Sequence, residues 1–220
     1  SSPEFLQERT STLRTGLTIG APQDVRRAAE ALGATSICNI YGSTETYGNC
    51  VVTEASWPLE KRAQCQGEPL PGVTVRVRDP DSGALLPDGE VGVLEVHGYL
   101  TPGYAGVSSE HNATAFTADG WFVTGDLAML NADSTVTYQG RQSEMIKRSG
   151  INVSPAEVEE VLQLLPQVGL AGVTGLSDAE RGQLIIAFIV PRPDEMIDRD
   201  TILAHCKTHI LVSCKNKHAG

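Results

Sequence analysis

The sequence has no long apolar run and no excess of basic residues. Its longest apolar run, Leu184–Val190, is too short to span a membrane, because a transmembrane helix needs roughly 20 such residues. The first residues do not follow the charged-then-apolar pattern of a secretory signal. The 17 basic and 27 acidic residues give a formal net charge of −10. Nucleic acid and anionic membranes are bound mainly through Lys and Arg, so the composition disfavours both as partners.

Paired cysteines are also lacking. The 5 cysteines contain no Cys-x-x-Cys pair, and an odd number cannot pair completely. This usage is typical of a reduced, cytoplasmic protein whose thiols are buried as small apolar groups. The histidines have no metal-ligand spacing with cysteine, so His205 and His209 indicate a partly exposed helix face rather than a zinc site.

The length and composition are ordinary for a globular protein. The 220 residues are 40% hydrophobic and 20% charged, which fits one large or two small domains. No internal repeat is visible. Ser2–Phe5 is either a cloning remnant or native chain within a domain.

Residues 1–66 follow an α/β pattern. Leu17–Ile19 predicts a short buried strand, apolar spacing predicts a helix over Asp24–Leu32, and Ser36–Ile40 predicts a second strand. Ligands in such sheets collect at the carboxyl ends of strands. We therefore expect a loop beginning with Tyr41 and Gly42 to lie where a ligand binds.

Residues 67–140 change to short strands separated by turns, which predicts a β-rich subdomain. The expected elements are strands over Val73–Val77 and Glu90–Val96, a turn over Asp79–Gly83, and a hairpin of Leu127–Leu130 with Thr135–Tyr138. Residues 143–220 then predict a small α+β unit. Its expected elements are a hairpin across Ser149 and Gly150, a helix that begins with the capping box Ser154–Glu157, a strand over Leu184–Val190, and a helix from Thr201 capped by Asp200.

Three short segments carry the chemistry. They are Tyr41–Thr46 (YGSTET), Trp121–Asp126 (WFVTGD) and Gly140–Gly150 (GRQSEMIKRSG). The first offers an aromatic ring to a base, hydroxyls to phosphate oxygens and a carboxylate to a divalent cation. The later Asp126 and Arg141 suit the hydroxyls of a ribose. In this order, the segments resemble the adenylate-forming superfamily of acyl- and aryl-CoA synthetases, peptide-synthetase adenylation domains and luciferases.

The resemblance implies an architecture and an activity. Residues 1–142 would be the carboxyl-terminal part of a large nucleotide-binding domain, and residues 143–220 a small, truncated α+β lid domain. The activity would be that of an acid:CoA ligase that uses ATP, Mg²⁺ and coenzyme A, with a fatty acid favoured over an aryl acid. Such an enzyme forms an acyl-adenylate and then turns its lid to make the thioester.

The resemblance also assigns residues of the first part to the nucleotide. The backbone of Gly20, Ala21 and Pro22 would lie against adenine, beside Tyr41 and Gly42. Thr44 would bond an α-phosphate oxygen, and Glu45 would bind Mg²⁺. The plainer interpretation is that both segments are ordinary turns.

Residues around the predicted boundary receive roles in the same way. Asp126 and Arg141 would bind the ribose, although a turn acid and a surface ion pair would look alike. Ser143, with Glu144 beside it, stands at the hinge, where the family more often has Asp or Lys. Lys147 and Gly150 would face the thiol substrate, with a solvated lysine and a turn glycine as alternatives.

Two family features are missing from the sequence. Nothing before Tyr41 resembles the phosphate loop, and Lys215 resembles a non-catalytic lysine that precedes the catalytic one. We therefore expect a carboxyl-terminal fragment that is inactive alone. Val153–Glu159 and Lys147 resemble the CoA-ligase branch. The alternatives are an adenylation domain that loads a carrier protein and a non-catalytic nucleotide- or partner-binding protein.

Overall fold

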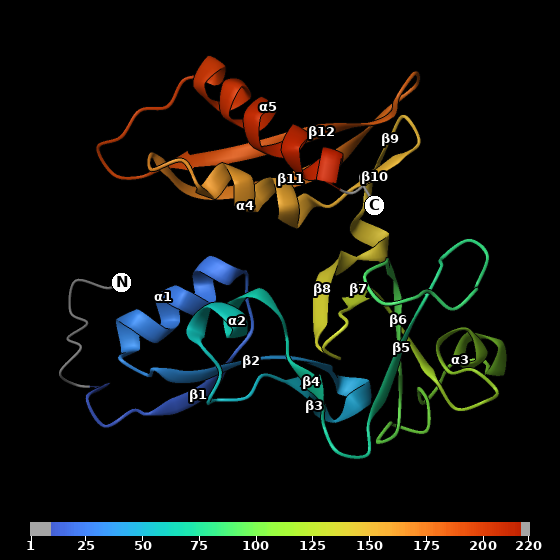
Figure 1. Ribbon diagram of the computed structural model, residues 1–220. Helices are drawn as coiled ribbons and strands as arrows, with labels where there is room; N and C mark the ends of the chain where they lie inside the picture. Colours follow the sequence, from blue (N-terminus) through green and yellow to red (C-terminus); the bar gives the residue numbers. More distant parts are fainter. Residues whose placement is uncertain (1–9, 217–220) are drawn as a thin grey trace. The chain divides into compact units, whose positions relative to one another are not determined.

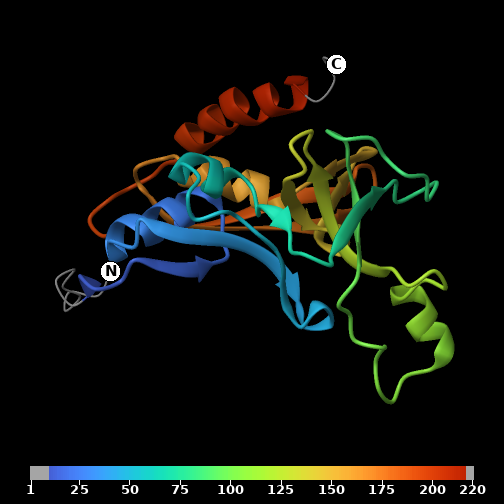
Figure 2. The same ribbon diagram turned by 60° about the horizontal axis from the view of Figure 1, so that its bottom comes forward.

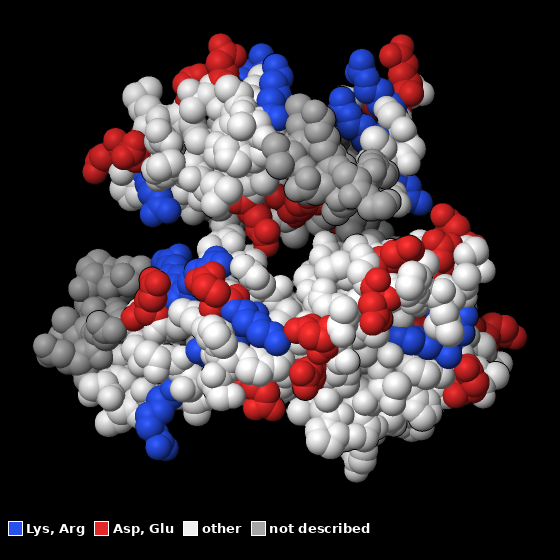
Figure 3. All heavy atoms as spheres, viewed as in Figure 1, with Lys and Arg blue, Asp and Glu red and all other residues white. Residues whose placement is uncertain are grey.

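The computed structural model describes residues 10–216, with side chains described as far as His209. Ser2–Phe5 and the side chain of Lys215 lie outside this description. The chain forms two compact units, residues 1–138 and 139–220 (Figure 1). None of the helices in residues 10–216 combines the length and hydropathy of a membrane span. Acidic and basic side chains are interspersed on the face of each unit in Figure 3.

The first unit opens with a sheet in the order β1-β2-β3-β4, in which β1 and β2 are parallel and the other neighbours antiparallel. Its elements are β1 (Thr15–Thr18), α1 (Pro22–Leu32), β2 (Ser36–Ser43), the 3₁₀ turn η2 (Thr44–Thr46), β3 (Gly48–Val52), α2 (Leu59–Gln64) and β4 (Glu68–Pro69). The predicted strand, helix and strand are thus confirmed as elements. α2 was not predicted.

The expectation that the first strand is buried is wrong. Leu17 is 57% exposed and Ile19 is 74% exposed. α1 and α2 lie on the same face of this sheet (Figures 1 and 2), where Ile37 packs with α1. Leu17 pairs with Cys38, the next residue along β2, and so lies on the opposite face. Within the described part of this unit, no helix covers that face.

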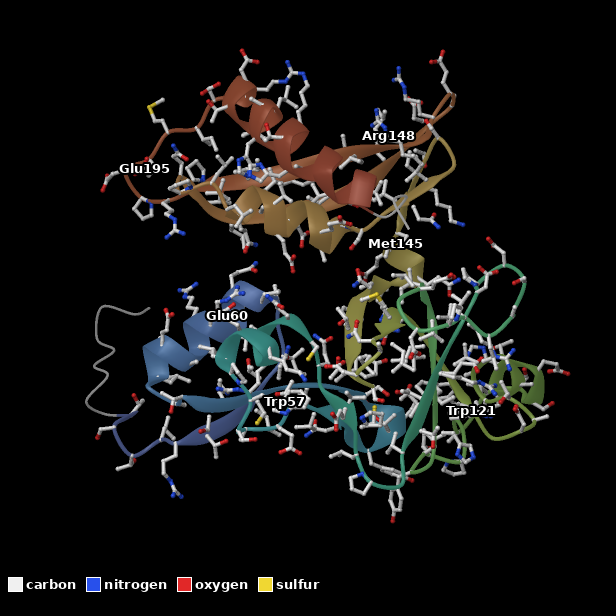
Figure 4. All side chains as sticks on the ribbon, viewed as in Figure 1. Trp57, Glu60, Trp121, Met145, Arg148 and Glu195 are labelled. Carbon is white, nitrogen blue, oxygen red and sulfur yellow. The ribbon has the colours of Figure 1, made fainter. Side chains whose placement is uncertain are left out.

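A buried arginine fastens α2 to the sheet. Arg62 is 3% exposed and donates hydrogen bonds to the carbonyls of Trp57 at 2.9 Å and Thr35 at 2.6 Å, and to the carbonyl of Ile37. The ring of Trp57, labelled in Figure 4, lies 4.0 Å from Lys61 Nζ. The hydrogen bonds of Arg62 to the three carbonyls satisfy its charged guanidinium group where water is excluded.

The second half of this unit is a sheet in the order β5-β6-β7-β8. Its elements are β5 (Thr74–Arg78), β6 (Val91–His97), α3 (Ser109–Ala115), β7 (Phe122–Leu130) and β8 (Val136–Arg141), which runs past residue 138 into the second unit. These strands confirm the predicted β-rich subdomain. One core cluster joins both sheets, with Tyr41, Cys50 and Val51 from the first packing against Leu94 and Val136 from the second.

The second unit has a sheet in the order β10-β9-β12-β11. Its elements are the 3₁₀ turn η3 (Gln142–Glu144), β9 (Ile146–Arg148), β10 (Ile151–Val153), α4 (Pro155–Gln163), β11 (Val168–Asp178), β12 (Gly182–Pro191) and α5 (Arg199–Asn216). Val158 and Leu162 of α4 share a core cluster with Val168, Ala171 and neighbours on α5. The predicted hairpin, helix and strand are confirmed.

The two helix starts differ in how well they were predicted. The Ser154 hydroxyl accepts from Glu157 N at 3.4 Å, and Pro155 is the first helical residue. Asp200 is not the cap of α5, because Asp198 Oδ1 accepts from the backbone N–H groups of both Asp200 and Thr201 at 2.9 Å. The acid two residues earlier therefore satisfies the first amides of the helix.

Candidate functional site

Two of the predicted nucleotide residues meet in the first unit. Tyr41 lies on β2 and Asp126 on β7, and the Tyr41 hydroxyl donates to Asp126 Oδ2 at 2.6 Å across 85 residues of sequence. Tyr41 is 7% exposed and Asp126 is 6% exposed. The Thr124 hydroxyl accepts from Asp126 N at 3.0 Å, which fixes the backbone beneath the carboxylate. The pair therefore joins the first two motifs at one buried point.

The protonation of this pair follows from its surroundings. Burial is the main cause that raises the pKa of the Tyr41 hydroxyl far above its ordinary value, and the hydrogen bond and charge of Asp126 raise it further. The phenol therefore stays a donor at any physiological pH. A short O–H···O bond to a carboxylate is among the stronger hydrogen bonds of a protein, so it holds the Asp126 side chain in a single orientation.

Tyr41 and Gly42 lie within a strand rather than in a loop. β2 continues to Ser43 because β3 pairs back on it, with Tyr41 opposite Val51 and Gly42 opposite Asn49. A side chain at Gly42 would bring its Cβ to 1.8 Å from the carbonyl oxygen of Gly48. Glycine is therefore required here by the close approach of two backbones.

The hydroxyls that follow have different surroundings. Thr46 is buried, accepts from Ser43 N at 2.9 Å and donates to the Gly48 carbonyl at 2.8 Å. Its hydroxyl thus closes the turn η2. Thr44, at the beginning of the same turn, is exposed. The arrangement leaves Thr44 as the hydroxyl of the motif with access to a ligand.

Glu45 is held by a residue that sequence reasoning missed. The Tyr104 hydroxyl donates to Glu45 Oε1 at 2.7 Å across 59 residues of sequence, and Thr101 N donates to the Glu45 carbonyl at 2.8 Å. Tyr104 precedes α3 in a turn-rich stretch. Its aromatic ring was the only signal in the sequence, and a tyrosine in a turn specifies no partner.

The segment Gly20, Ala21 and Pro22 forms the beginning of α1. Ala21 is the N-terminal cap residue and Pro22 the first helical residue, which is a favoured place for proline. A Cβ at Gly20 would lie 3.1 Å from Asp24 Cβ. Packing at the start of the helix thus accounts for the small residue, and the adenine contact stays a prediction.

The second unit carries the remaining predicted residues. Arg141 ends β8, and Ser143 and Glu144 are exposed in η3. Their roles at the ribose and the hinge stay predictions. Lys147 lies on β9, with an exposed side chain and a backbone N–H that donates to Gln183 Oε1 at 2.6 Å.

Gly150 is in a tight turn. Ser149 has φ 50° and Gly150 has φ 82°, both in the left-handed region that two-residue hairpin turns use. Apart from Gly150 and its two chain neighbours, no heavy atom lies within 4 Å of a Cβ built on Gly150. The structure therefore gives the glycine a conformational reason, while the open space around it is compatible with the predicted passage of a thiol arm.

The histidines and cysteines of the described chain form ordinary contacts. His205 Nε2 lies 2.8 Å from the Val161 carbonyl, and His209 Nδ1 lies 2.9 Å from the His205 carbonyl. No group of three or more His, Cys, Asp and Glu side chains with metal-binding geometry occurs among the described residues. Burial raises the pKa of the Cys50 thiol to about 11.

Comparison with known proteins agrees with the geometry. A family described as "AMP-binding enzyme" matches residues 2–105, and one described as "AMP-binding enzyme C-terminal domain" matches residues 157–217. The chain belongs to the AMP-binding enzymes. It corresponds to the carboxyl-terminal portion of their fold, and spans 33–38% of the length of the first curated relatives that it matches.

Relatives and solved structures of these AMP-binding enzymes include ligases for different acids. Salicylyl-CoA synthase / salicylate adenylyltransferase from a Streptomyces species is 32% identical over 84% of this chain and 33% of its own length. The mitochondrial medium-chain acyl-CoA ligase ACSF2 of Danio rerio is 29% identical over 94% and 35%. ATP-bound MatB from Rhodopseudomonas palustris has a TM-score of 0.84 at 29% identity, over 94% of this chain and 41% of MatB.

Proposed function

We propose that this chain is part of an ATP-dependent acid:CoA ligase. The observation that supports this most is the hydrogen bond between Tyr41 and Asp126, which joins two nucleotide motifs from distant parts of the sequence. The reaction has two steps. A substrate carboxylate attacks the α-phosphorus of ATP and expels pyrophosphate, which gives an acyl-adenylate. The thiol of coenzyme A, losing its proton, then attacks the acyl carbon and releases AMP.

The first step depends on position and charge. Asp126 would accept hydrogen bonds from the ribose hydroxyls, in an orientation that the Tyr41 hydroxyl fixes. Thr44 would donate to an oxygen of the α-phosphate. Arg141 would donate to the same ribose, and Gly20–Pro22 would offer backbone to the adenine. Catalysis of this kind places the reacting oxygen in line with the phosphorus and neutralises the developing charge.

Glu45 suits the divalent cation that such a reaction uses. Its carboxylate is only partly buried, and its Oε1 is oriented by Tyr104. Oxygen ligands from one or two carboxylates, together with phosphate, are what Mg²⁺ prefers. Glu45 would therefore hold Mg²⁺, which would neutralise phosphate charge.

The second step belongs to the second unit. Lys147 and Gly150 would face the pantetheine arm after a rotation at Ser143 and Glu144. For the acid we propose a fatty acid before an aryl acid, although relatives of both kinds match, the medium-chain ligase of Danio rerio at 29% and the salicylyl-CoA synthase at 32% identity. We also propose that this chain alone is inactive and that the enzyme acts in the cytoplasm.

A substrate panel tests the proposal. The full-length enzyme that contains this chain would be assayed for pyrophosphate release with alkanoic acids of increasing length and with benzoate and salicylate. We expect acid-dependent pyrophosphate release that is greatest with an alkanoic acid, and none from the 220-residue chain alone. Preference for salicylate would indicate that the substrate is an aryl acid rather than a fatty acid. Absence of acid-dependent release with every acid would favour a non-catalytic nucleotide-binding protein.

A further inference from the structure

We propose that residues 101–117 form a brace that positions Glu45, with Tyr104 as the positioning residue. This rests on the proposed function, because it concerns the carboxylate that would hold the divalent cation. Two bonds connect the brace to η2. The Tyr104 hydroxyl donates to Glu45 Oε1 at 2.7 Å, and Thr101 N donates to the Glu45 carbonyl at 2.8 Å. Side chain and backbone of Glu45 are thus fixed by the same segment.

The brace is held in shape by an asparagine. Asn112, on α3, accepts from Tyr104 N at 2.8 Å and donates to the Tyr104 carbonyl at 3.1 Å. Gly103 lies between Thr101 and Tyr104, the two residues that bond Glu45. It has φ 137°, and a Cβ there would approach the Asn112 side chain at 3.1 Å. The loop therefore turns sharply around the amide group, which places the Tyr104 ring toward Glu45 rather than toward solvent.

An aromatic series connects the brace to the strand of Asp126. The Tyr104 ring is 5.5 Å from Phe116, and Phe116 is stacked at 5.2 Å on Phe122. Phe122 is buried at the beginning of β7, four positions before Asp126 in the sequence. Glu45 and Asp126, the two carboxylates of the proposed site, are consequently connected through this packed aromatic series. The series would thereby help to set the distance between the proposed metal and ribose sites.

A positioning role of the Tyr104 hydroxyl can be distinguished by experiment from a role in stabilising the fold. Loss of the Tyr104 hydroxyl leaves the ring series and the Asn112 bonds in place, so the fold should persist. The Glu45 carboxylate would then lose one of the contacts that orient it, and the remaining ordering on metal binding would cost free energy. The expected result is weaker divalent-cation binding, with little change in the melting temperature.

The test compares Tyr104→Phe with Tyr99→Phe, which removes the hydroxyl of an exposed tyrosine, and with Glu45→Gln. Amide hydrogen exchange in the 220-residue chain should show faster exchange of Thr101 N–H in Tyr104→Phe only. In the full-length enzyme, electron paramagnetic resonance should show Mn²⁺ binding with ATP weakened on the order of tenfold by Tyr104→Phe. Its KM for Mg²⁺ should rise more than its kcat falls, and Tyr99→Phe should resemble wild type.

The outcomes separate the brace from the proposed function. If Glu45→Gln weakens Mn²⁺ binding while Tyr104→Phe leaves it and the Thr101 exchange rate unchanged, the brace is wrong and the metal role of Glu45 stands. If Glu45→Gln itself leaves Mn²⁺ binding unchanged, the metal role fails and the brace has no function. A fall in melting temperature with unaltered Mn²⁺ affinity in Tyr104→Phe would also overturn the positioning role.

Discussion

At the scale of residues, the Tyr41–Asp126 hydrogen bond is the contact on which the proposed nucleotide site depends most. Replacing Asp126 with alanine would leave the buried Tyr41 hydroxyl without its carboxylate acceptor, so binding and stability would change together. Asp126→Asn avoids this, because the amide oxygen still accepts from Tyr41 while the negative charge is lost. The substitution isolates the carboxylate's role toward a ligand.

We predict that Asp126→Asn in the full-length enzyme weakens ATP binding by about ten- to a hundredfold, since a hydrogen bond to a charged group contributes about 1.5–3 kcal/mol. Isothermal titration calorimetry measures this, with circular dichroism to confirm folding. Tyr138→Phe serves as the control, because it removes the hydroxyl of a neighbouring ring, whose centroid lies 6.1 Å from that of Tyr41, and leaves the carboxylate in place. Unchanged ATP affinity in folded Asp126→Asn would remove the ribose role.

At the scale of elements, the pairing of β2 with β3 depends on Gly42. A Cβ at this position would overlap the Gly48 carbonyl, whereas a Cβ at Gly16 on β1 would lie 3.9 Å from Ile37 Cγ1, an ordinary contact. We predict that Gly42→Ala lowers the free energy of unfolding by about 3 kcal/mol or more, and Gly16→Ala by less than about 1 kcal/mol. Urea unfolding of both variants measures the difference. Equal losses would show that the β2–β3 register is wrong.

An ion pair links α2 to the β7–β8 turn, and it predicts that the stability of the fold depends on pH. Asp133 accepts from the Thr135 hydroxyl at 2.6 Å and lies 2.9 Å from Lys61 Nζ. These partners, Thr135 first and then Lys61, lower the pKa of Asp133 from 3.8 to about 2. A lowered carboxyl pKa stabilises the folded state above pH 3.8, and this contribution is lost as pH falls toward 2.

Asp133→Asn should therefore be less stable than wild type near pH 6, and the difference should shrink as pH falls through the window between the two pKa values. Thermal melts at a series of pH values measure it. Asp81→Asn, an exposed turn acid, is the control and should change little. A difference that stays constant down to pH 2 would contradict the assignment.

Which elements could be predicted follows from how local their causes are. The α1 and α4 helices and the β9–β10 hairpin were predicted, because spacing, proline and turn residues act within a few positions. The exposure of Leu17 was not, since an apolar run predicts a strand but not whether its face is covered. The cap of α5 was misplaced because two acids, Asp198 and Asp200, stand within one turn of each other.

The site shows the same limit. The motif residues could be proposed because they adjoin one another in the sequence, and the resemblance supplied their predicted roles. The bonds of Tyr41 to Asp126 and of Tyr104 to Glu45 join residues 85 and 59 positions apart. Such contacts depend on how two sheets share one core, and no local pattern encodes them.

At the scale of the whole molecule, most residues proposed for the two half-reactions would fall on different units, with Arg141, proposed at the ribose from the second unit, as the exception. The proposed adenylation residues Glu45 and Asp126 lie in residues 1–138, and the proposed thiol-facing residues Lys147 and Gly150 lie in residues 139–220. An AMP-binding enzyme built this way should allow one half-reaction to be removed without the other. The proposed function depends on this separation of the adenylation and thiol-facing residues.

Gly150→Trp in the full-length enzyme tests it most directly, with Gly150→Asn as the matched control. Asparagine tolerates the left-handed φ of 82° and lacks the bulk of tryptophan. It therefore reports the effect of replacing the glycine without a large side chain that would block the thiol arm. We predict that Gly150→Trp keeps acid-dependent pyrophosphate exchange and loses CoA thioester formation, while Gly150→Asn keeps both. Loss of both activities in folded Gly150→Trp, or of neither, would contradict the division of the two half-reactions between the units.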